Sequence, residues 1–309
     1  MLESTATDRP NDSLQRFLFE ALDIRGVLAR LDESWVQVRT AHTYPEAAQQ
    51  LLGELLTATA LLASVVKVRG TLTVQATGDG PLAAVMAECR DRSELRGIAR
   101  IRDEAALRAT EASTPASTRP LGRGVLTITI RPDGGEPYQG IVPLAGSSLA
   151  EALEGYFVQS EQIPTRVWLS AGTAGTAGMM IQALPAELAI KNHPEREREE
   201  DFNRIALLAD TVSDAELHEL HGERLLTRLF FEEAVALQQP VDLRFSCNCS
   251  RDRTREALRA MPRAELEEII EEEGAIEMTC QFCHTEYRFD GIDVALVHAE
   301  PDPVDDRIH

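Results

Sequence analysis

The chain has few aromatic residues, few cysteines and no long apolar segment. Phe, Trp and Tyr together make up 5% of its 309 residues. The most apolar run, LLTATALLASVV between Glu54 and Lys67, has twelve uncharged residues, whereas about 18 to 20 are needed to span a bilayer. The N-terminus MLESTATDRPNDS lacks the basic start and apolar block of a secretory signal. We therefore expect a soluble, cytoplasmic protein with a flexible tail over residues 1–13 and no membrane partner.

Positive charge is also scarce, with 31 Lys and Arg against 51 Asp and Glu and a net charge of −20. Because binding to a phosphate backbone needs clustered Lys and Arg, we expect no nucleic-acid partner. The sequence has no P-loop, G-x-S-x-G or H-E-x-x-H motif, which predicts a protein that is not an enzyme. Five unevenly placed cysteines are too few for a disulfide-built secreted scaffold, so metal binding or redox chemistry is favoured.

Residues 14–193 predict a mixed α/β domain. A T-x-x-E capping box from Thr43 to Glu46 precedes the apolar run and predicts a helix over residues 44–66. TITIRPDGGEPYQGIV predicts a β-hairpin, because Pro, Asp and Gly supply the turn between two strand-like runs. SSLAEALEGYFVQS predicts a short amphipathic helix, and AGTAGTAG a flexible loop before a strand at MMIQAL.

The composition changes at KNHPEREREEDF, where residues 195–201 contain five acids and two Arg. We expect a metastable helical linker over residues 194–240. Its apolar residues recur at helical spacing and must pack against another surface; they are Phe202, Ile205, Leu208 or Ala209, Val212, Leu217, Leu220, Leu225, Leu229 and Phe230.

Residues 241–309 predict a compact C-terminal domain with helices at TREALRAM and RAELEEIIEEEG and a strand at AIEMT. A segment of this size buries little surface and is marginally stable unless metal or disulfides stabilise it. The fold class predicted for the whole chain is therefore α+β, with an N-terminal mixed α/β domain, a helical linker and a small C-terminal zinc-binding domain.

Four of the five cysteines lie in this last segment. Cys247 and Cys249 form a C-x-C pair, and Cys280 and Cys283 follow as C-x-x-C after thirty intervening residues. Four thiolates suit tetrahedral zinc, so these cysteines are the predicted metal ligands, with one Zn²⁺ per chain. A purely structural zinc ribbon remains an alternative, but C-x-C departs from the usual knuckle spacing.

The predicted zinc site is also a store of oxidisable sulfur. Zinc with four thiolates carries a net charge near −2, which the nearby Arg244, Arg251, Arg253, Arg255 and Arg288 could offset. Thiolates are the form that oxidants attack, and each close pair can close on itself as a small strained ring. Loss of zinc should unfold the C-terminal domain; if the linker helices rest on it, their apolar stripe becomes exposed as well.

Several segments resemble the thirty-three-kilodalton heat-shock protein family of redox-regulated chaperones. The resemblance spans nearly the whole chain and includes RFLFE, RGVLARL, LLASVVK, GDGPL, RGIAR, YQGIVPL and YFVQSEQIPTR, followed by the two cysteine pairs. It implies an ATP-independent holdase that is inactive when reduced and zinc-bound. Under oxidative stress it would form Cys247–Cys249 and Cys280–Cys283 disulfides, release zinc, loosen the linker and act as a homodimer on unfolding client proteins.

Other hypotheses have less support in the residues. A thiol–disulfide oxidoreductase would place C-x-x-C at a helix start within a βαβ unit, whereas CQFCHTEYRFDG runs into a short aromatic segment. A nucleic-acid-binding zinc ribbon would need a basic stripe. We expect His284 to lie at the surface or to support the ligands, Cys89 to be a buried inert side chain outside the switch, and the Glu run of residues 265–273 to form a solvated helix face.

Overall fold

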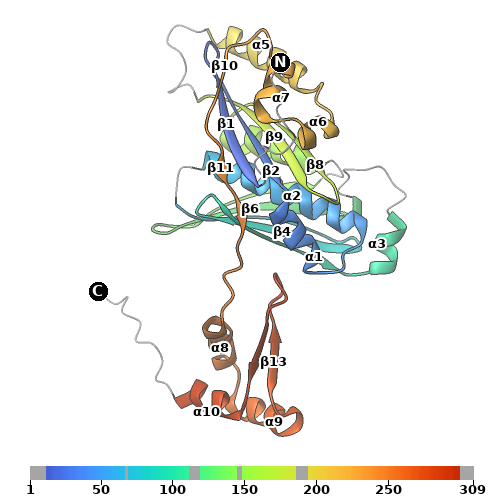
Figure 1. The fold of residues 1–309 in the computed structure, drawn as a ribbon, viewed down its shortest axis with the longest axis vertical. Coiled ribbons are helices and arrows are strands. Elements are labelled where there is room, and N and C mark those ends of the chain that lie inside the picture. Colours follow the sequence, from blue (N-terminus) through green and yellow to red (C-terminus); the bar gives the residue numbers. More distant parts are fainter. Residues whose placement is uncertain (1–11, 67–68, 111–118, 145–147, 186–193, 300–309) are drawn as a thin grey trace, which may run out of the picture. The chain divides into compact units, whose positions relative to one another are not determined.

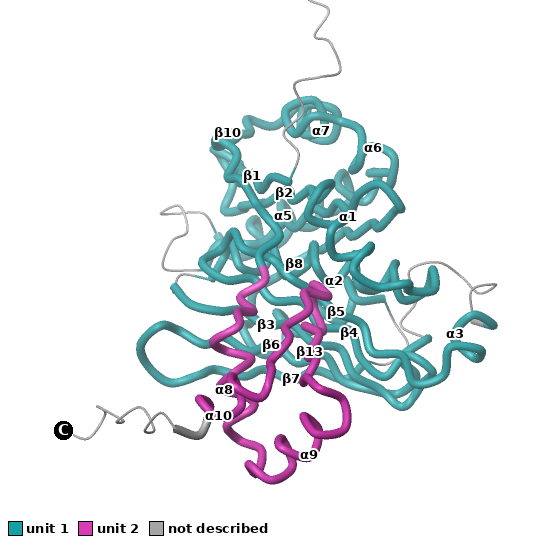
Figure 2. Tube along the Cα trace, turned by 60° about the horizontal axis from the view of Figure 1, so that its bottom comes forward, with its two compact units in different colours: residues 1–246 teal, residues 247–309 magenta. Residues whose placement is uncertain are grey.

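The structure, a computed structural model, describes residues 12–66, 69–110, 119–144, 148–185 and 194–299. The chain forms two compact units that meet in sequence between Ser246 and Cys247, and Figure 2 colours them separately. The larger unit mixes helices with sheets and the smaller has helices and a two-stranded sheet, which confirms the predicted α+β class. Residues 1–11 of the expected flexible tail lie outside the described residues.

Two six-stranded sheets build the larger unit. The strands of the first sheet are β1 (Ser13–Phe19), β2 (Ile24–Leu31), β8 (Thr165–Ala171), β9 (Thr176–Ala183), β10 (Val235–Leu237) and β11 (Val241–Asp242). Their order is β10-β1-β2-β9-β8, and β11 also pairs with β1. All of these pairs are antiparallel.

The strands of the second sheet are β3 (Gly70–Gly78), β4 (Leu82–Arg90), β5 (Glu94–Ile101), β6 (Gly124–Pro132), β7 (Tyr138–Leu144) and β12 (Arg244–Phe245). Their order is β12-β5-β4-β3-β6-β7, and only the β12–β5 pair is parallel among the described residues. The β6–β7 pair confirms the hairpin that the sequence predicted.

The helical segments of the larger unit are α1 (Glu33–Thr40), α2 (Glu46–Val65), α3 (Glu104–Thr110), a 3-10 turn η1 (Arg119–Leu121), α4 (Leu149–Tyr156), a π-helical turn η2 (Phe157–Glu161), α5 (Glu195–Ala209), α6 (Asp214–Glu219) and α7 (Gly222–Leu229). The predicted amphipathic helix corresponds to α4 and η2, and a capping box between Ser148 and Glu151 begins it.

Helix α2 lies between the two sheets, where its apolar residues pack against both (Figure 1). The helix predicted over residues 44–66 is confirmed, but the capping box predicted between Thr43 and Glu46 is wrong. Pro45 is the N-cap residue, and no side chain caps the helix. Proline presets the φ angle needed at a helix start and has no N–H to leave unsatisfied there.

Glu54 is a buried acid in the middle of α2, with 2% of its surface exposed. Burial raises the pKa of Glu54 to about 7, a hydrogen bond from Gln50 opposes this, and Asp214 raises the pKa further. The folded protein therefore binds this proton more tightly than the unfolded chain, so the free energy of unfolding falls as pH rises from about 4.5 to about 7.

We expect Glu54→Gln to remove this pH dependence, because glutamine has the same shape and never ionises. The variant should gain on the order of 3 kcal/mol over the wild type between pH 4 and pH 8. Both tryptophans, Trp35 and Trp168, lie in the larger unit. Urea unfolding followed by tryptophan fluorescence therefore measures the free energy of unfolding of that unit. Parallel pH profiles for the two proteins would contradict the prediction.

The stretch AGTAGTAG is a tight turn and the start of a strand. Residues 172–175 connect β8 to β9, and the Gly172 N–H donates to the Gly175 carbonyl at 2.9 Å. The flexible loop predicted there is therefore wrong for Ala171, the last residue of β8, and for residues 176–178, which belong to β9. A Cβ atom at Gly178 would lie 2.9 Å from the Thr57 methyl group of α2, so the small residue permits close packing between strand and helix.

Helices α5, α6 and α7 cover the face of the first sheet that points away from α2 (Figure 1). They supply Phe202, Ile205, Ala206, Ala209, Leu217, Leu225, Leu226 and Leu229, and Phe230 follows α7; the sheet supplies Phe17, Phe19, Ile24, Ala177, Met179 and Ile181. Of the two alternatives predicted from the sequence, Ala209 is buried and Leu208 is 36% exposed. The apolar stripe of these helices therefore packs on the larger unit itself.

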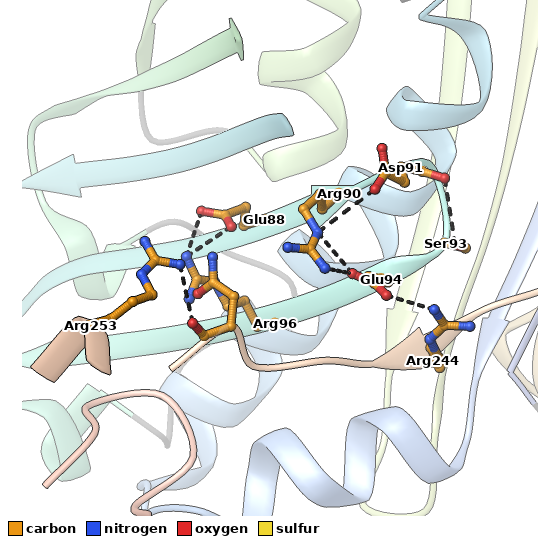
Figure 3. A network of polar contacts seen from close by, with 9 residues as sticks. Glu88, Arg90, Asp91, Ser93, Glu94, Arg96, Arg244 and Arg253 are labelled. Carbon is orange, nitrogen blue, oxygen red and sulfur yellow. Dashed lines mark hydrogen bonds and ion pairs between the residues drawn. The ribbon is translucent and has the colours of Figure 1, made fainter. Parts of the chain in front are cut away.

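The segment after α7 returns along both sheets as three short strands. Strands β10 and β11 pair with β1, and β12 pairs with β5. Glu94 of β5 accepts a hydrogen bond from Arg244 of β12 at 2.6 Å and also pairs with Arg90, as Figure 3 shows. The Ser246 N–H donates to the Leu95 carbonyl at 2.9 Å, so the last residue before the smaller unit is still hydrogen-bonded to β5.

The smaller unit contains α8 (Arg251–Arg259), α9 (Arg263–Glu273), β13 (Ile276–Thr279), β14 (Glu286–Phe289) and α10 (Gly291–Ala299). The predicted helices and the AIEMT strand are confirmed, and the glutamates of α9 are all exposed, as predicted for a solvated helix face. Its buried apolar core consists of Leu258, Leu266, Ile276, Phe289, Val294 and Val297. Such a small core stabilises the unit only weakly.

Candidate metal and redox centre

The four cysteines lie at two adjacent positions of the smaller unit. Cys247 and Cys249 precede α8, whose N-cap residue Ser250 accepts a hydrogen bond from the Arg253 N–H. Cys280 and Cys283 lie in the turn between β13 and β14, which pair antiparallel from Ile276–Phe289 to Thr279–Glu286. A helix start and a hairpin turn, each fixed by local hydrogen bonds, therefore supply two thiols each.

The four sulfur atoms form one cluster in which all lie within 4.8 Å of one another. The Cys247 and Cys280 sulfurs are 3.6 Å apart, and those of Cys249 and Cys283 are 3.4 Å apart. A tetrahedral zinc ion with Zn–S bonds of about 2.3 Å would hold its sulfurs roughly 3.8 Å apart. The cluster therefore has the ligand type, number and spacing that a metal ion of this kind requires.

The turn that carries Cys280 and Cys283 is closed by backbone hydrogen bonds. The Cys280 N–H donates to the Thr285 carbonyl and the His284 N–H donates to the Cys280 carbonyl, both at 2.9 Å. His284 has a left-handed backbone with φ of 54°, a conformation that costs a non-glycine residue some energy. Its side chain is exposed, and the sulfur cluster contains no histidine.

Two side chains contact the sulfurs that the sequence did not identify as site residues. The Tyr287 hydroxyl donates to the Cys249 sulfur at 3.1 Å, and the Thr285 hydroxyl lies 3.2 Å from the Cys283 sulfur. Tyr287 belongs to β14 and Thr285 precedes it, so the hairpin register places both beside the cluster. Hydrogen bonds of this kind stabilise negative charge on sulfur and orient metal ligands.

Without metal, the thiols ionise unequally. Burial raises the pKa of Cys247 to about 12 and also raises that of Cys249. Burial opposes ionisation at Cys283 too, but the Thr285 hydrogen bonds and the neighbouring thiols together lower its pKa to about 6. A bound divalent metal would hold all four as thiolates.

The arginines predicted to offset the cluster's charge have other partners. Arg251 bonds to Asp293 at 2.7 Å and lies over the Phe289 ring, 4.5 Å from its centroid. Arg288 pairs with Glu277 at 3.2 Å, and Arg253 donates to the Asn248 carbonyl at 3.1 Å. Arg251 thus connects α8 to β14 and α10, Arg288 joins the two strands of the hairpin, and Arg253 joins α8 to the residues before it. All three stabilise the scaffold that holds the cysteines.

Cys89 is in β4 of the larger unit and is separate from this cluster. Its side chain is 1% exposed, and burial raises its pKa to about 12. The predicted burial of Cys89 is confirmed. Because neutral, buried thiols react slowly with oxidants, we expect it to be inert.

The two compact units and the thiol cluster together define the class to which this protein belongs. A small unit with four clustered thiols follows a larger α/β unit, and the intervening helices cover an apolar sheet face. No helix of the described chain is both long enough and apolar enough to cross a membrane.

Comparisons with known proteins identify the family. Residues 12–290 match the family model described as Hsp33 protein. A 33 kDa chaperonin of Shewanella frigidimarina is 42% identical over 289 residues, covering 94% of this chain and 96% of the relative. A 33 kDa chaperonin of Enterobacter sp. is 39% identical over 303 residues, covering 97% of this chain and 99% of the relative. The chain therefore belongs to the Hsp33 family.

The fold agrees with this assignment. The crystal structure of a 33 kDa chaperonin from Thermotoga maritima matches with a TM-score of 0.75 at 22% identity, covering 93% of this chain and 98% of that one. At this identity the match concerns the fold alone.

Proposed function

We propose that the protein is a chaperone of the holdase type, which binds unfolding proteins without ATP and is switched on by oxidation of its four cysteines. The observation that carries this proposal is the sulfur cluster in a unit whose own core is small. The family's relatives, named 33 kDa chaperonin, support the chaperone role. The activity is binding rather than catalysis, so no enzymatic role is proposed.

In the reduced state, Cys247, Cys249, Cys280 and Cys283 would hold one Zn²⁺. Bound structural zinc contributes on the order of 10 to 16 kcal/mol to the folding of small sites. The six residues that form the buried core cluster of the smaller unit supply far less than a typical domain core. The metal would therefore be the main source of stability for residues 247–299.

Oxidation would remove the ligands in pairs. Peroxide converts one thiolate of a pair to a sulfenic acid, and the partner sulfur displaces hydroxide from it, so each pair loses two electrons and peroxide is reduced to water. We propose that the pairs are Cys247 with Cys249 and Cys280 with Cys283. Two disulfides would leave no thiolate to hold zinc, and the smaller unit would unfold.

The linker helices depend on packing against the sheet for their stability. Helices α5, α6 and α7 have 15, 6 and 8 residues, and helices this short are stable only through packing. The chain that joins them to Cys247 is held by strands of three, two and two residues. If the helices detach, Phe17, Phe19 and Ile181 of the sheet would become an apolar surface suited to unfolding clients.

The proposed oligomeric state, compartment and activating condition follow from this switch. Exposed apolar surface would also favour pairing of two chains, so we propose that the oxidised form is a homodimer. A switch whose cysteines are reduced at rest requires a reducing compartment, and we therefore propose the cytoplasm. Oxidative stress would be the condition that activates the protein.

Mapping the disulfides tests the proposed pairing. Trypsin leaves Cys247 and Cys249 in peptide 245–251, and Cys280 and Cys283 in peptide 264–288. Local pairing predicts two separate peptides, each lacking two hydrogens, when the oxidised protein is digested without reduction and analysed by mass spectrometry.

The sulfur positions also allow disulfides between the two pairs, and the same digest would detect them. The sulfurs of Cys247 and Cys280 are 3.6 Å apart and those of Cys249 and Cys283 are 3.4 Å apart, and disulfides between those pairs would connect the two peptides. A single linked peptide would overturn the local pairing. As a control, Cys89 should remain alkylatable after denaturation in both reduced and oxidised samples.

An aggregation assay tests the holdase function. An unfolding test protein is heated with the reduced, zinc-loaded chain or with the chain pretreated with peroxide, and light scattering is followed without nucleotide. The oxidised chain should suppress scattering and the reduced chain should not. Equal suppression by both forms would reject the switch, and no suppression by either would reject the chaperone.

A thiol–disulfide oxidoreductase remains the main rival. Such enzymes place C-x-x-C at the start of a helix, where the helix lowers the thiol pKa. Here Cys280 and Cys283 lie between β13 and β14, and a hairpin turn does not provide that field.

A further inference from the structure

The larger unit contains a cavity of about 500 Å³ on the α2 side of the first sheet. The end of α2, strands β3 and β6 and the π-helical turn η2 form its apolar walls, with Leu62, Leu72, Ile128, Ile130 and Phe157 among the lining residues. Pockets that hold small molecules commonly measure about 300 to 1,000 Å³ and are mostly apolar. The proposed switch uses neither this cavity nor its lining.

The cavity and the linker helices are on opposite faces of the same two strands. Ile24 and Ile181 pack under the linker helices, whereas the next residues along their strands, Arg25 and Gln182, line the cavity. Successive side chains of a strand point to opposite faces, so this follows from the register that pairs Arg25 with Gln182. A molecule in the cavity would therefore not compete with the linker.

Arg25 is a cation with no acidic partner among the described residues. Its Nε donates to the Gln182 side-chain oxygen at 3.1 Å, and its Nη2 contacts the same oxygen. Gln182 is neutral and is itself 1% exposed. Burial lowers the pKa of Arg25 and Arg16 lowers it further, whereas a close carboxylate would raise it. The site therefore favours an incoming anion.

The part of the cavity lining that includes Tyr156 and η2 is polar and irregular. The Tyr156 hydroxyl lies 3.1 Å from the Glu161 carboxylate and 3.3 Å from the Tyr138 hydroxyl. Phe157 and Glu161 belong to η2, and Gln162 after it has a left-handed φ of 55°. Single π-helical turns and left-handed non-glycine residues occur frequently at binding sites. Glu136 and Glu161 also line the cavity and are exposed, so Arg25 is the one cation among the described lining residues.

We propose that this cavity binds an amphipathic monocarboxylate, such as a medium-chain fatty acid, with its carboxylate on Arg25 and its chain between Leu62, Ile128 and Phe157. A carboxylate accepts paired hydrogen bonds from a guanidinium, which supplies affinity and orientation. The apolar walls bury the chain. Glu136 and Glu161 disfavour a second negative charge in the cavity, so a monoacid binds better than a diacid.

Calorimetric titration of the reduced, zinc-loaded chain with laurate, below its micelle concentration, tests the proposal. Laurate should bind once per chain, and dodecanol, which has the same chain length and no charge, should bind more weakly. Arg25→Gln should weaken laurate about ten- to a hundredfold, the range expected for lost charged hydrogen bonds, and leave dodecanol unchanged. Arg25→Lys should restore most of the laurate affinity.

Arg100→Gln is the matched control, because Arg100 is an exposed arginine on β5 of the other sheet. It should bind laurate as the wild type does. Ile130→Phe should weaken both ligands by filling the cavity, and its thermal unfolding shows whether it is folded. The proposal is overturned if laurate shows no saturable binding, if dodecanol binds as tightly, or if Arg25→Gln binds laurate like the wild type.

Discussion

Replacing Cys280 with serine is expected to unfold residues 247–299 of the reduced protein and leave the larger unit folded. The substitution removes one of four proposed zinc ligands, and structural zinc contributes on the order of 10 to 16 kcal/mol to small sites. That is as large as the roughly 5 to 15 kcal/mol that stabilises a whole domain. The six-residue core of the smaller unit cannot offset such a loss.

Hydrogen exchange measured by mass spectrometry resolves this effect along the chain. Peptides from α8, α9 and the β13–β14 hairpin should exchange fully, whereas peptides from α2 and β9 should keep their protection. A zinc chelator added to the wild type should produce the same pattern. Cys89→Ala is the matched control, because Cys89 lies in the larger unit outside the sulfur cluster. Protected hairpin peptides in the metal-free protein would contradict the prediction.

Phe230→Ala is expected to activate the protein without oxidation. Phe230 is 1% exposed and lies 5.0 Å from the Phe19 ring and 6.4 Å from the Phe17 ring, centroid to centroid. Truncation of a buried phenylalanine typically costs about 3 to 5 kcal/mol, and here the loss falls on the contact between the linker and the sheet. The reduced, zinc-loaded variant should therefore suppress aggregation of a test protein.

The neighbouring residue provides the control. Phe231 is 76% exposed, so Phe231→Ala should change stability by less than about 0.5 kcal/mol and leave the reduced protein inactive. Helix α5 offers a second pair of variants. Ile205 is 0% exposed and Leu207 is 69% exposed, so Ile205→Ala should behave like Phe230→Ala and Leu207→Ala like Phe231→Ala. If Phe230→Ala speeds exchange in α5–α7 but the reduced protein stays inactive, the linker is not the cover that the proposal requires.

Much of the site could be predicted because it is local in sequence. Two cysteine pairs, each within four residues, bring their thiols together through one turn or one helix start, and the four residues predicted as ligands do form one cluster. The residues that tune the cluster were harder to find. Tyr287 and Thr285 reach the sulfurs through the register of the β13–β14 hairpin, and register depends on pairing that the sequence pattern leaves open.

In the fold, too, local features could be predicted from the sequence and long-range packing could not. The α2 helix and the β6–β7 hairpin follow from apolar periodicity and turn residues. The glycines of AGTAGTAG resemble a flexible loop in isolation, yet Gly178 is required by its approach to α2. The apolar stripe of the linker was predicted, but the surface beneath it was not, because a helical pattern shows that a face is buried without identifying its partner.

The most direct test of the switch follows zinc and linker exchange in one sample during oxidation. The reduced, zinc-loaded protein is treated with peroxide at mild heat while a colorimetric chelator measures released zinc and hydrogen exchange reports on residues 195–229. The account predicts one zinc released per chain, with a parallel rise in exchange of α5–α7 and retained protection of α2. Full oxidation of the four cysteines with zinc still bound, or with the linker helices still protected, would contradict it.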